Sequence, residues 1–229
     1  MKKEKEFFVG IDLGLEKNKT SAICVIVKKK KRIFPKIDWC KNCQNILGKE
    51  VFKKLKPLLK KTKVIAIDSP LTKGRGKGKM RLFEKFFSRK TFREAKINPV
   101  PPALIESVQE FSLKLRKKLE KEGFILDINL IEVSSRISSA FLDFSFISEL
   151  PKNFKIPCQT KDQKSAFFAA ILAFLHSKFK TRYIGYKDGF LFLPQITFWK
   201  KEWRKKFYLA WKERPRLKYR YLITNCFEK

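Results

Sequence analysis

The chain has 229 residues, with 54 Lys and Arg against 22 Asp and Glu and a formal net charge of +32. Its 44% hydrophobic content and 23 Phe exclude a disordered basic tail, because such a chain can bury enough surface to offset the entropy of ordering. The length predicts one large domain, or one domain with an appendage. The charge favours nucleic acid as a partner; an anionic membrane surface and thermal adaptation are the alternatives.

The first part of the chain predicts strands followed by a crossover helix. Residues 7–13, 20–27 and 33–37 are β-rich runs joined by short links, which predict an antiparallel meander. Helical spacing of apolar residues over 46–60 predicts a helix, and the apolar run 64–68 then predicts a parallel strand buried on both faces. These patterns favour an α/β domain.

The second part continues the alternation after an irregular, basic and proline-rich middle. The predicted elements are helices over 80–88 and 103–123, a strand over 125–133, a very apolar helix that begins at Thr160, and a last strand over 189–194. Thr160 and Gln163 have the spacing of a capping box. The apolar run 166–175 is about half the ~20 residues that a bilayer span needs, so it predicts a buried helix. The N-terminal residues lack the pattern of a signal peptide, and we expect a cytoplasmic protein with no membrane segment.

Four carboxylates occur at the ends of these apolar elements, in a chain that is poor in acids. They are Asp12, Asp68, Glu132 and Asp162. A carboxylate in an apolar strand is costly unless it is paired or binds a metal ion. Strands that bring such groups to one sheet edge would concentrate negative charge, which one or two Mg²⁺ or Mn²⁺ ions would relieve. Two such ions can clamp the attacking and leaving oxygens of a phosphodiester.

Each carboxylate also has a purely structural explanation. Asp12 and Asp68 can form turns with nearby backbone. Glu132 can pair with Arg136, four residues later, and Asp162 suits the first turn of a helix, where the helix dipole favours an acid. For any single residue the structural explanation is the better one, but the order of the elements favours a common function.

That order resembles a domain-of-unknown-function family described as predicted RNase H-like nucleases, in the RuvC-like branch. The segments are VGIDLG (9–14), IAIDSPL (65–71), LIEVSSR (130–136), TKDQKSAFFAAILAFL (160–175) and GFLFLP (189–194). The family pattern has Gly-Ile-Asp on the first strand, Asp-x-Pro after the fourth, Glu on the fifth and Asp-x-x-Asp-Ala at a helix start. The chain matches it at all four carboxylates and departs at Ser165, where RuvC-like members usually have a second Asp.

The resemblance implies an RNase H-like mixed five-stranded sheet flanked by helices over residues 1–195. A basic aromatic C-terminal extension over 196–229 would pack on or beside it. The family resemblance further implies a metal-dependent nuclease that hydrolyses DNA or RNA, with the four carboxylates as catalytic and metal-binding residues. Because Ser165 is a poor metal-bridging ligand, a non-catalytic nucleic-acid-binding protein is the alternative. A phosphotransfer enzyme of the actin-like or sugar-kinase class shares the Gly-Ile-Asp-Leu-Gly strand but normally needs two such domains, for which this chain is too short.

Basic residues cluster in the loop beside Asp68 and in the tail. The candidate phosphate contacts are Lys73, Arg75, Lys77, Lys79, Arg81, Arg214, Arg216, Lys218 and Arg220. The loop lacks the spacing of a P-loop, and its alternative is a solvated loop with no partner. In the tail, Trp199, Trp203, Phe207 and Trp211 stand four apart on one predicted helix face. We expect Trp199 and Trp203 to pack on the core and the residues after Pro215 to form a stacking surface; a membrane-surface helix is the lesser alternative.

Cys40 and Cys43 form a lone Cys-x-x-Cys motif. A structural zinc site would need two further ligands, and His176, the only histidine, falls late in the predicted apolar helix. We therefore expect a reduced pair of cysteines, with zinc or redox chemistry as a minor alternative. The same placement of His176 argues against a Cys–His or Ser–His hydrolase.

Overall fold

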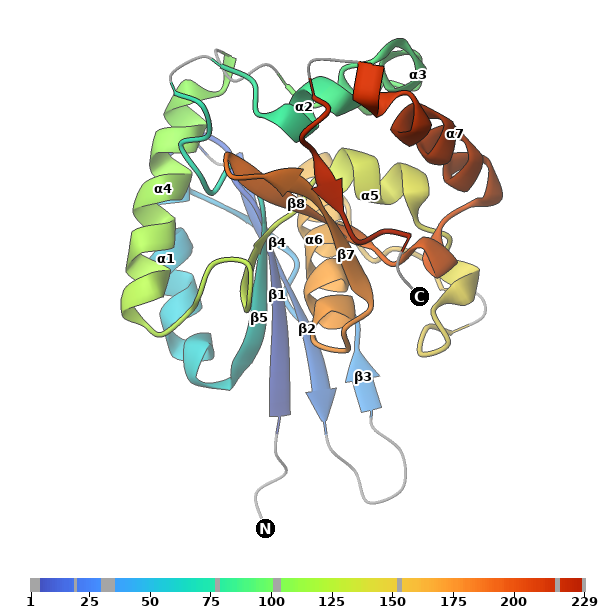
Figure 1. Cartoon of the computed structure of the whole chain (residues 1–229). Coiled ribbons are helices and arrows are strands. Elements are labelled where there is room, and N and C mark those ends of the chain that lie inside the picture. The colour runs from blue at the N-terminus through green and yellow to red at the C-terminus, as the bar shows by residue number, and fades with distance from the viewer. Residues whose placement is uncertain are drawn as a thin grey trace.

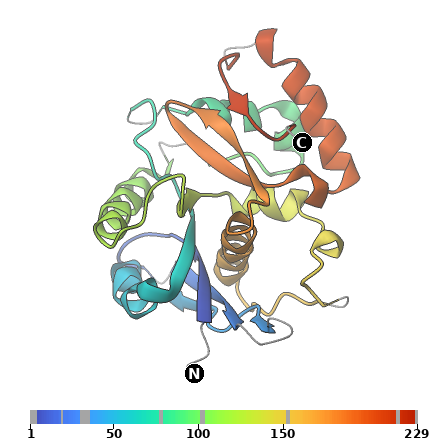
Figure 2. The same cartoon turned by 60° about the horizontal axis from the view of Figure 1, so that its bottom comes forward.

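The computed structural model describes residues 5–18, 20–29, 36–76, 79–100, 104–151, 154–216 and 219–227. Within these residues, a six-stranded mixed sheet carries helices on both faces, and a separate three-stranded antiparallel sheet lies beyond one end of it (Figures 1 and 2). The α/β class predicted from the sequence is confirmed.

The main sheet has the strand order β3-β2-β1-β5-β6, and β4 also pairs with β2. The strands are β1 (Lys5–Asp12), β2 (Ser21–Lys29), β3 (Lys36–Asp38), β4 (Gln44–Ile46), β5 (Thr62–Asp68) and β6 (Leu130–Glu132). The predicted meander is confirmed, since β1, β2 and β3 are antiparallel neighbours. The predicted parallel strand is also confirmed, because β5 runs parallel to β1 and to β6. The expected count of five strands is wrong, because the short β4 adds a further pairing to β2.

The helices are α1 (Val51–Leu55), α2 (Leu82–Phe87), α3 (Lys90–Glu94), α4 (Glu106–Lys121), α5 (Ser135–Phe141), α6 (Lys161–His176) and α7 (Lys201–Lys212). The helix predicted over 46–60 is instead the short α1 between two 3₁₀ turns, Gly48–Glu50 and Lys56–Lys61. Pro57 lies in the second turn and has no amide hydrogen to continue an α-helical ladder. The strand predicted over 125–133 shortens to β6 because Ile128, Asn129 and Leu130 donate to the carbonyl of Ile125, forming a turn.

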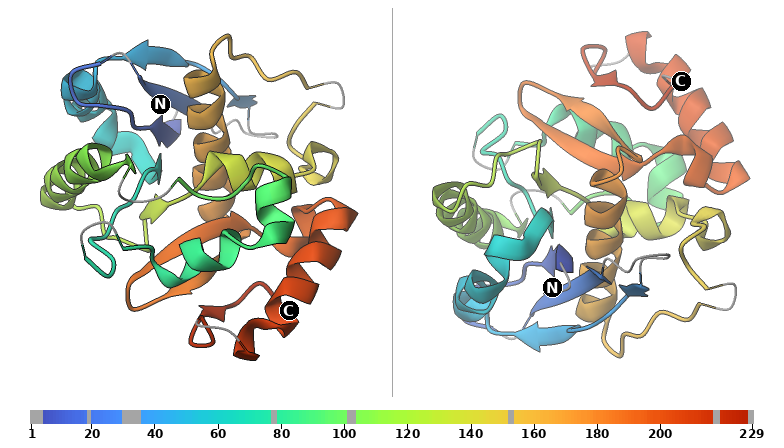
Figure 3. Two further views of the ribbon diagram at one scale, coloured as in Figure 1. Left: turned by 90° about the horizontal axis from the view of Figure 1, so that it is seen from above. Right: turned by 90° about the horizontal axis from the view of Figure 1, so that it is seen from below.

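Helices cover the two faces of the main sheet unequally (Figure 3). On one face, α1 and α4 pack on Val9, Ile65 and their neighbours. The helix α6 lies on the other face, and its residues 169–175 are all fully buried. The predicted N-cap is confirmed, since Thr160 Oγ1 accepts from the Gln163 amide at 3.2 Å. The second half of the capping box differs by one residue, because the Gln163 side chain accepts from the amide of Gln159.

The second sheet has the order β8-β7-β9, with β7 (Thr181–Tyr186), β8 (Gly189–Pro194) and β9 (Ile223–Thr224). It shares an aromatic core with α2, α3, α5 and α7. The predicted packing of Trp199 and Trp203 is confirmed: Trp199 is fully buried and Trp203 is 4% exposed. Both rings contact Phe141 of α5. No helix in the described parts of the chain combines the length and apolarity needed to cross a membrane.

Gly10 of β1 allows α6 to lie directly on the sheet. A Cβ atom at this position would overlap the carbonyl oxygen of Ala166 and the amide nitrogen of Ala170, which are backbone atoms of α6. Such atoms cannot rotate away as a flexible side chain can. The close contact therefore requires glycine.

We predict that Gly10→Ala destabilises the fold by more than the roughly 1–3 kcal/mol usual for an overpacked core. Urea unfolding would measure the loss. Gly76→Ala is the control, because Gly76 has a positive φ of +108° but open space around it, so that only the backbone conformation is penalised, by roughly 1–2 kcal/mol. Equal losses in the two variants would contradict the close contact of β1 and α6.

Candidate functional site

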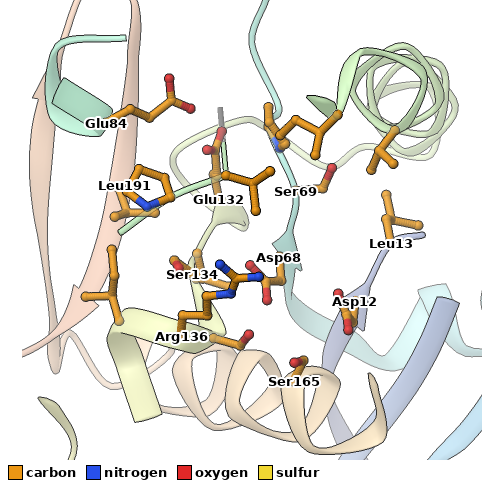
Figure 4. A pocket seen from close by; sticks show the side chains of 18 of the residues that line it. Asp12, Leu13, Asp68, Ser69, Glu84, Glu132, Ser134, Arg136, Ser165 and Leu191 are labelled. Carbon is orange, nitrogen blue, oxygen red and sulfur yellow. The ribbon is translucent and has the colours of Figure 1, made fainter. Parts of the chain in front are cut away.

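The four predicted carboxylates line one cavity of about 320 Å³ at the carboxyl ends of β1, β5 and β6. Parallel pairing of β1 and β5 places Asp12 directly opposite Asp68 in the register. β6 contributes Glu132 from the next strand, and the first turn of α6 contributes Asp162. Figure 4 shows the Asp12 and Asp68 carboxylates side by side, with Ser165 of α6 below Asp12.

The neighbours of Asp12 compensate its charged form only in part. Burial and the charges of Asp68 and Asp162 raise the pKa of Asp12 to about 8, although a hydrogen bond from the Ser165 hydroxyl and the nearby Lys161 act in the opposite direction. A carboxyl group with this pKa is held in an environment that disfavours its charged form.

Asp68 interacts with two residues of α5, Ser135 and Arg136. Burial raises the pKa of Asp68, while the hydroxyl and the backbone amide of Ser135 donate to it and Arg136 favours its charge. Ser135 and Arg136 begin α5, and Figure 4 shows the Arg136 guanidinium beside Asp68. The exposed Arg136 is therefore a cation at the mouth of the cavity, next to a carboxylate.

Asp162 is held by a residue of the opposite edge of the sheet. Asn45 of β4 donates to Asp162 Oδ2 at 3.3 Å. The Asn45 side-chain oxygen in turn accepts from Thr160 Oγ1 and Gln163 Nε2, both at 2.9 Å. β4 thus fixes the start of α6 and orients its acid.

Glu132 is an exception among the four, because its charge is fully paired. Arg81 Nη1 and Nη2 donate to its two oxygens at 2.7 and 2.6 Å, and the Leu71 amide donates to Oε2 at 2.7 Å. Glu132 is 4% exposed, and Figure 4 shows its carboxylate pointing away from Asp12 and Asp68. These contacts give Glu132 a structural role and do not support the expected role as a metal ligand. The alternative expectation, an ion pair of Glu132 with Arg136, is also wrong.

Arg81 is the centre of a buried network. It is 3% exposed, and it binds Glu84 at 2.6 Å as well as Glu132. Beside it, Asp188 at the tip of the β7–β8 hairpin accepts from the Leu82 amide at 2.8 Å. The expected contact of Arg81 with nucleic acid is therefore wrong, because both ends of its guanidinium are engaged inside the protein.

The other predicted phosphate contacts lie on the surface or outside the described residues. Lys73, Arg75 and Lys79 are exposed in the loop after Asp68, and Arg216 and Arg220 are exposed in the tail. Arg214 is half-buried and stacks on Trp211, with 3.9 Å between the guanidinium carbon and the ring centroid. Lys77 and Lys218 lie outside the described residues.

A tight group of metal-ligating atoms occurs elsewhere. Among the described residues, the one set of three or more such side chains whose ligand atoms all lie within 4.8 Å of one another is Cys24, Cys40 and Cys43. This cluster could hold a metal ion. Asp12, Asp68 and Asp162 line a common cavity, but in the described structure the carboxylates of all three do not lie within 4.8 Å of one another.

Three residues of the site were not anticipated in these roles: Asn45, Ser135 and Arg136. Ser135 and Arg136 follow the β6 strand in the segment LIEVSSR, at the strand end where Asp68 also lies, and this placement was the available signal. In the sequence, nothing pointed to Asn45, because its contact with Asp162 spans 117 residues.

Comparison with protein-family models, with curated proteins and with solved structures finds no match for this chain.

Replacing Arg81 should expose how strongly this network holds the fold. Arg81→Met leaves Glu84 and Glu132 buried without a cation, and we predict a loss of roughly 3–5 kcal/mol in urea unfolding. Lys90→Ala, in an ion pair whose side chains are 84% and 65% exposed, should cost no more than about 1 kcal/mol. An equal loss of unfolding free energy in both variants would show that the buried network stabilises the fold no more than an exposed ion pair does.

The raised pKa of Asp12 predicts how stability depends on pH. The folded protein holds a proton on Asp12 up to about pH 8, whereas the ordinary pKa is 3.8, so this group lowers stability as pH rises through that interval. Without added divalent ions, Asp12→Asn should be more stable than the wild type at pH 8, by roughly 1–3 kcal/mol for a group partly open to water. At pH 4 the two proteins should unfold at the same urea concentration. An Asn variant that is the less stable protein at pH 8 would contradict the assignment.

Proposed function

We propose that this chain is a metal-dependent nuclease on an RNase H-like fold, which hydrolyses phosphodiester bonds in DNA or RNA. The observation that carries the proposal is the pair Asp12 and Asp68, in register at the ends of adjacent parallel strands, with Asp162 on the same cavity. An antiparallel meander followed by parallel strands, with the carboxylates at the strand ends, agrees with the family resemblance. Because a fold alone does not establish an activity, the argument rests on the cavity.

Mg²⁺ or Mn²⁺ fits the donor set of this cavity. Asp12, Asp68 and Asp162 offer carboxylate oxygens, which hard divalent cations prefer, and neither His nor Cys is among the described residues that line the cavity. Burial and the neighbouring carboxylates of Asp68 and Asp162 raise the pKa of Asp12, so its charged form lacks a sufficient counterion. A divalent cation would supply that counterion, and these three aspartates would hold it.

The ion, when bound, would polarise the phosphodiester and lower the pKa of a bound water molecule. The chain's own residues would do the rest. Arg136, exposed beside Asp68, would bind a phosphate oxygen. Ser165 would orient the Asp12 carboxylate through its hydroxyl. Ser69 Oγ lines the cavity, is buried and has no hydrogen-bond partner among the described residues, so it is free to hold a water molecule or a phosphate oxygen.

The surface around the cavity suits a polyanion. Lys73, Arg75 and Lys79 are exposed on the loop that leaves the cavity after Asp68. Contacts of this kind bind the phosphate backbone without reading its sequence. They would hold a strand across the acidic cavity, whose own charge would otherwise repel it.

The second candidate is a nucleic-acid-binding protein without catalysis. It is favoured by the pairing of Glu132 with Arg81, which removes one of the four expected ligands, and by Ser165 in place of an acid. The two candidates share the partner and differ in the chemistry.

The test measures cleavage and binding on the same proteins. Labelled single- and double-stranded DNA and RNA are incubated with the wild type, Asp12→Asn and Asp68→Asn, each with Mg²⁺ or Mn²⁺ and with a chelator. We expect metal-dependent cleavage that falls by at least about a hundredfold in both variants, since each loses a charge at the reacting centre. Binding should weaken steeply with salt and survive the substitutions.

Asp127→Asn is the matched control, because Asp127 lies outside the cavity and has a positive φ of 65°, which asparagine tolerates. It should cleave like the wild type. Salt-sensitive binding without cleavage by any protein would favour the second candidate, and cleavage that persists in Asp12→Asn would sink the proposed role of the aspartates.

A further inference from the structure

Three cysteines from distant parts of the sequence meet at one point. Cys24 lies in β2 and is fully buried, and Cys40 and Cys43 lie in the segment between β3 and β4. Their sulfur atoms are within 4.8 Å of one another. The sequence motif Cys-x-x-Cys thus gains a third sulfur that its spacing alone does not reveal.

Strand pairing explains why the sulfurs converge. β3 pairs with residues 27–29 of β2, and β4 pairs with residues 21–23 of the same strand edge. The connection between β3 and β4 therefore runs along β2 beside residues 24–26. The Lys41 amide donates to the Val25 carbonyl there, at 3.0 Å. Cys40 and Cys43 flank this anchor and are brought to Cys24 by it.

Disulfide chemistry does not account for three sulfurs. Cys43 lies next to both Cys24 and Cys40, but a sulfur atom can join only one disulfide. Either disulfide would leave one of the three cysteines as a free thiol beside it. Three thiolates around one centre, two of them in a Cys-x-x-Cys turn, supply three of the four ligands of a tetrahedral zinc ion.

We propose that Cys24, Cys40 and Cys43 bind a structural zinc ion. Cys158 is the candidate for the fourth ligand, and its sulfur atom, which lies outside the group of three, would have to move toward them. It belongs to the same apolar cluster, and the carbonyl oxygen of the preceding Pro157 lies 3.9 Å from Cys40 Sγ.

The zinc ion would link β2, the β3–β4 connection and, through Cys158, the segment before α6. Asn45, which orients Asp162, stands two residues after Cys43. The ion would thus hold in place the strand that supports the start of α6. This role is separate from the proposed nuclease chemistry and does not depend on it.

Metal content is the first test. The full chain, expressed with zinc in the medium and purified under reductant without chelator, should contain about one zinc ion per chain by elemental mass spectrometry. Cys40→Ser and Cys43→Ser should lose it, and Cys226→Ser, which changes a buried cysteine outside the cluster, should keep it. Zinc that is unchanged in Cys40→Ser and Cys43→Ser, or absent from the wild type, would overturn the proposal. Full zinc retention by Cys158→Ser would overturn the assignment of the fourth ligand.

Spectroscopy and thiol counting separate zinc from a disulfide even if a variant folds poorly. The wild type loaded with Co²⁺ should show the intense sulfur-to-metal absorption of a tetrahedral thiolate site, and Cys226→Ser should show the same band. After unfolding in a chelator, without reductant, all five cysteines should react with a thiol reagent. Two fewer reactive thiols together with no bound metal would show a disulfide and refute the zinc site.

Discussion

The packing of α6 on β1 fixes the geometry on which the acidic cavity depends. Because Gly10 has no side chain, the helix backbone at Ala166 and Ala170 rests directly on the strand. Asp12 is two residues further along β1, and Ser165 lies one residue before the contact on α6. A side chain at position 10 would lift the helix, separating the Ser165 hydroxyl from Asp12 and moving the helix start away from the cavity. The close contact between the backbones of β1 and α6 thus determines where Asp12 and Ser165 lie relative to each other.

Glu132 and Asp12 line the same cavity but differ in how their charge is compensated, because only Glu132 has a buried cation, Arg81, as a partner. Glu132 is enclosed more completely than Asp12, and burial raises its pKa, but Arg81 binds both its oxygens and acts against that rise. Asp12 has a hydroxyl and a nearby lysine, which offset its burial and its acidic neighbours only in part. The unbalanced charge is therefore concentrated on the β1–β5 side of the cavity. The chain as a whole carries a net charge of +32, so this local group of acids contrasts with the rest of the molecule. Burying these acids lowers the free energy of unfolding.

The sequence predicted what depends on local pattern and on the geometry of parallel strands. The meander, the buried parallel strand, the apolar α6 and the position of four carboxylates along one cavity follow from those rules, whereas the pairing of Glu132 with Arg81 does not. The rest depends on contacts between distant residues, which local patterns do not encode. Arg81 finds Glu132 across 51 residues, so its burial was missed. The convergence on Cys24 depends on the register of β3 and β4, and β9 is only two residues long.

The loop after Asp68 is closed at its base, because Arg81 Nη1 donates to Thr72 Oγ1 at 3.4 Å. On one side, Gln109 and Arg116 of α4 bind the carbonyls of Thr72 and Leu71, and on the other side Arg81 is locked in its network. Among the described residues between these anchors, Lys73, Arg75 and Lys79 are exposed. Related chains could therefore gain or lose residues here without loss of the fold, and the reach of the basic side chains could evolve independently of the acids they surround.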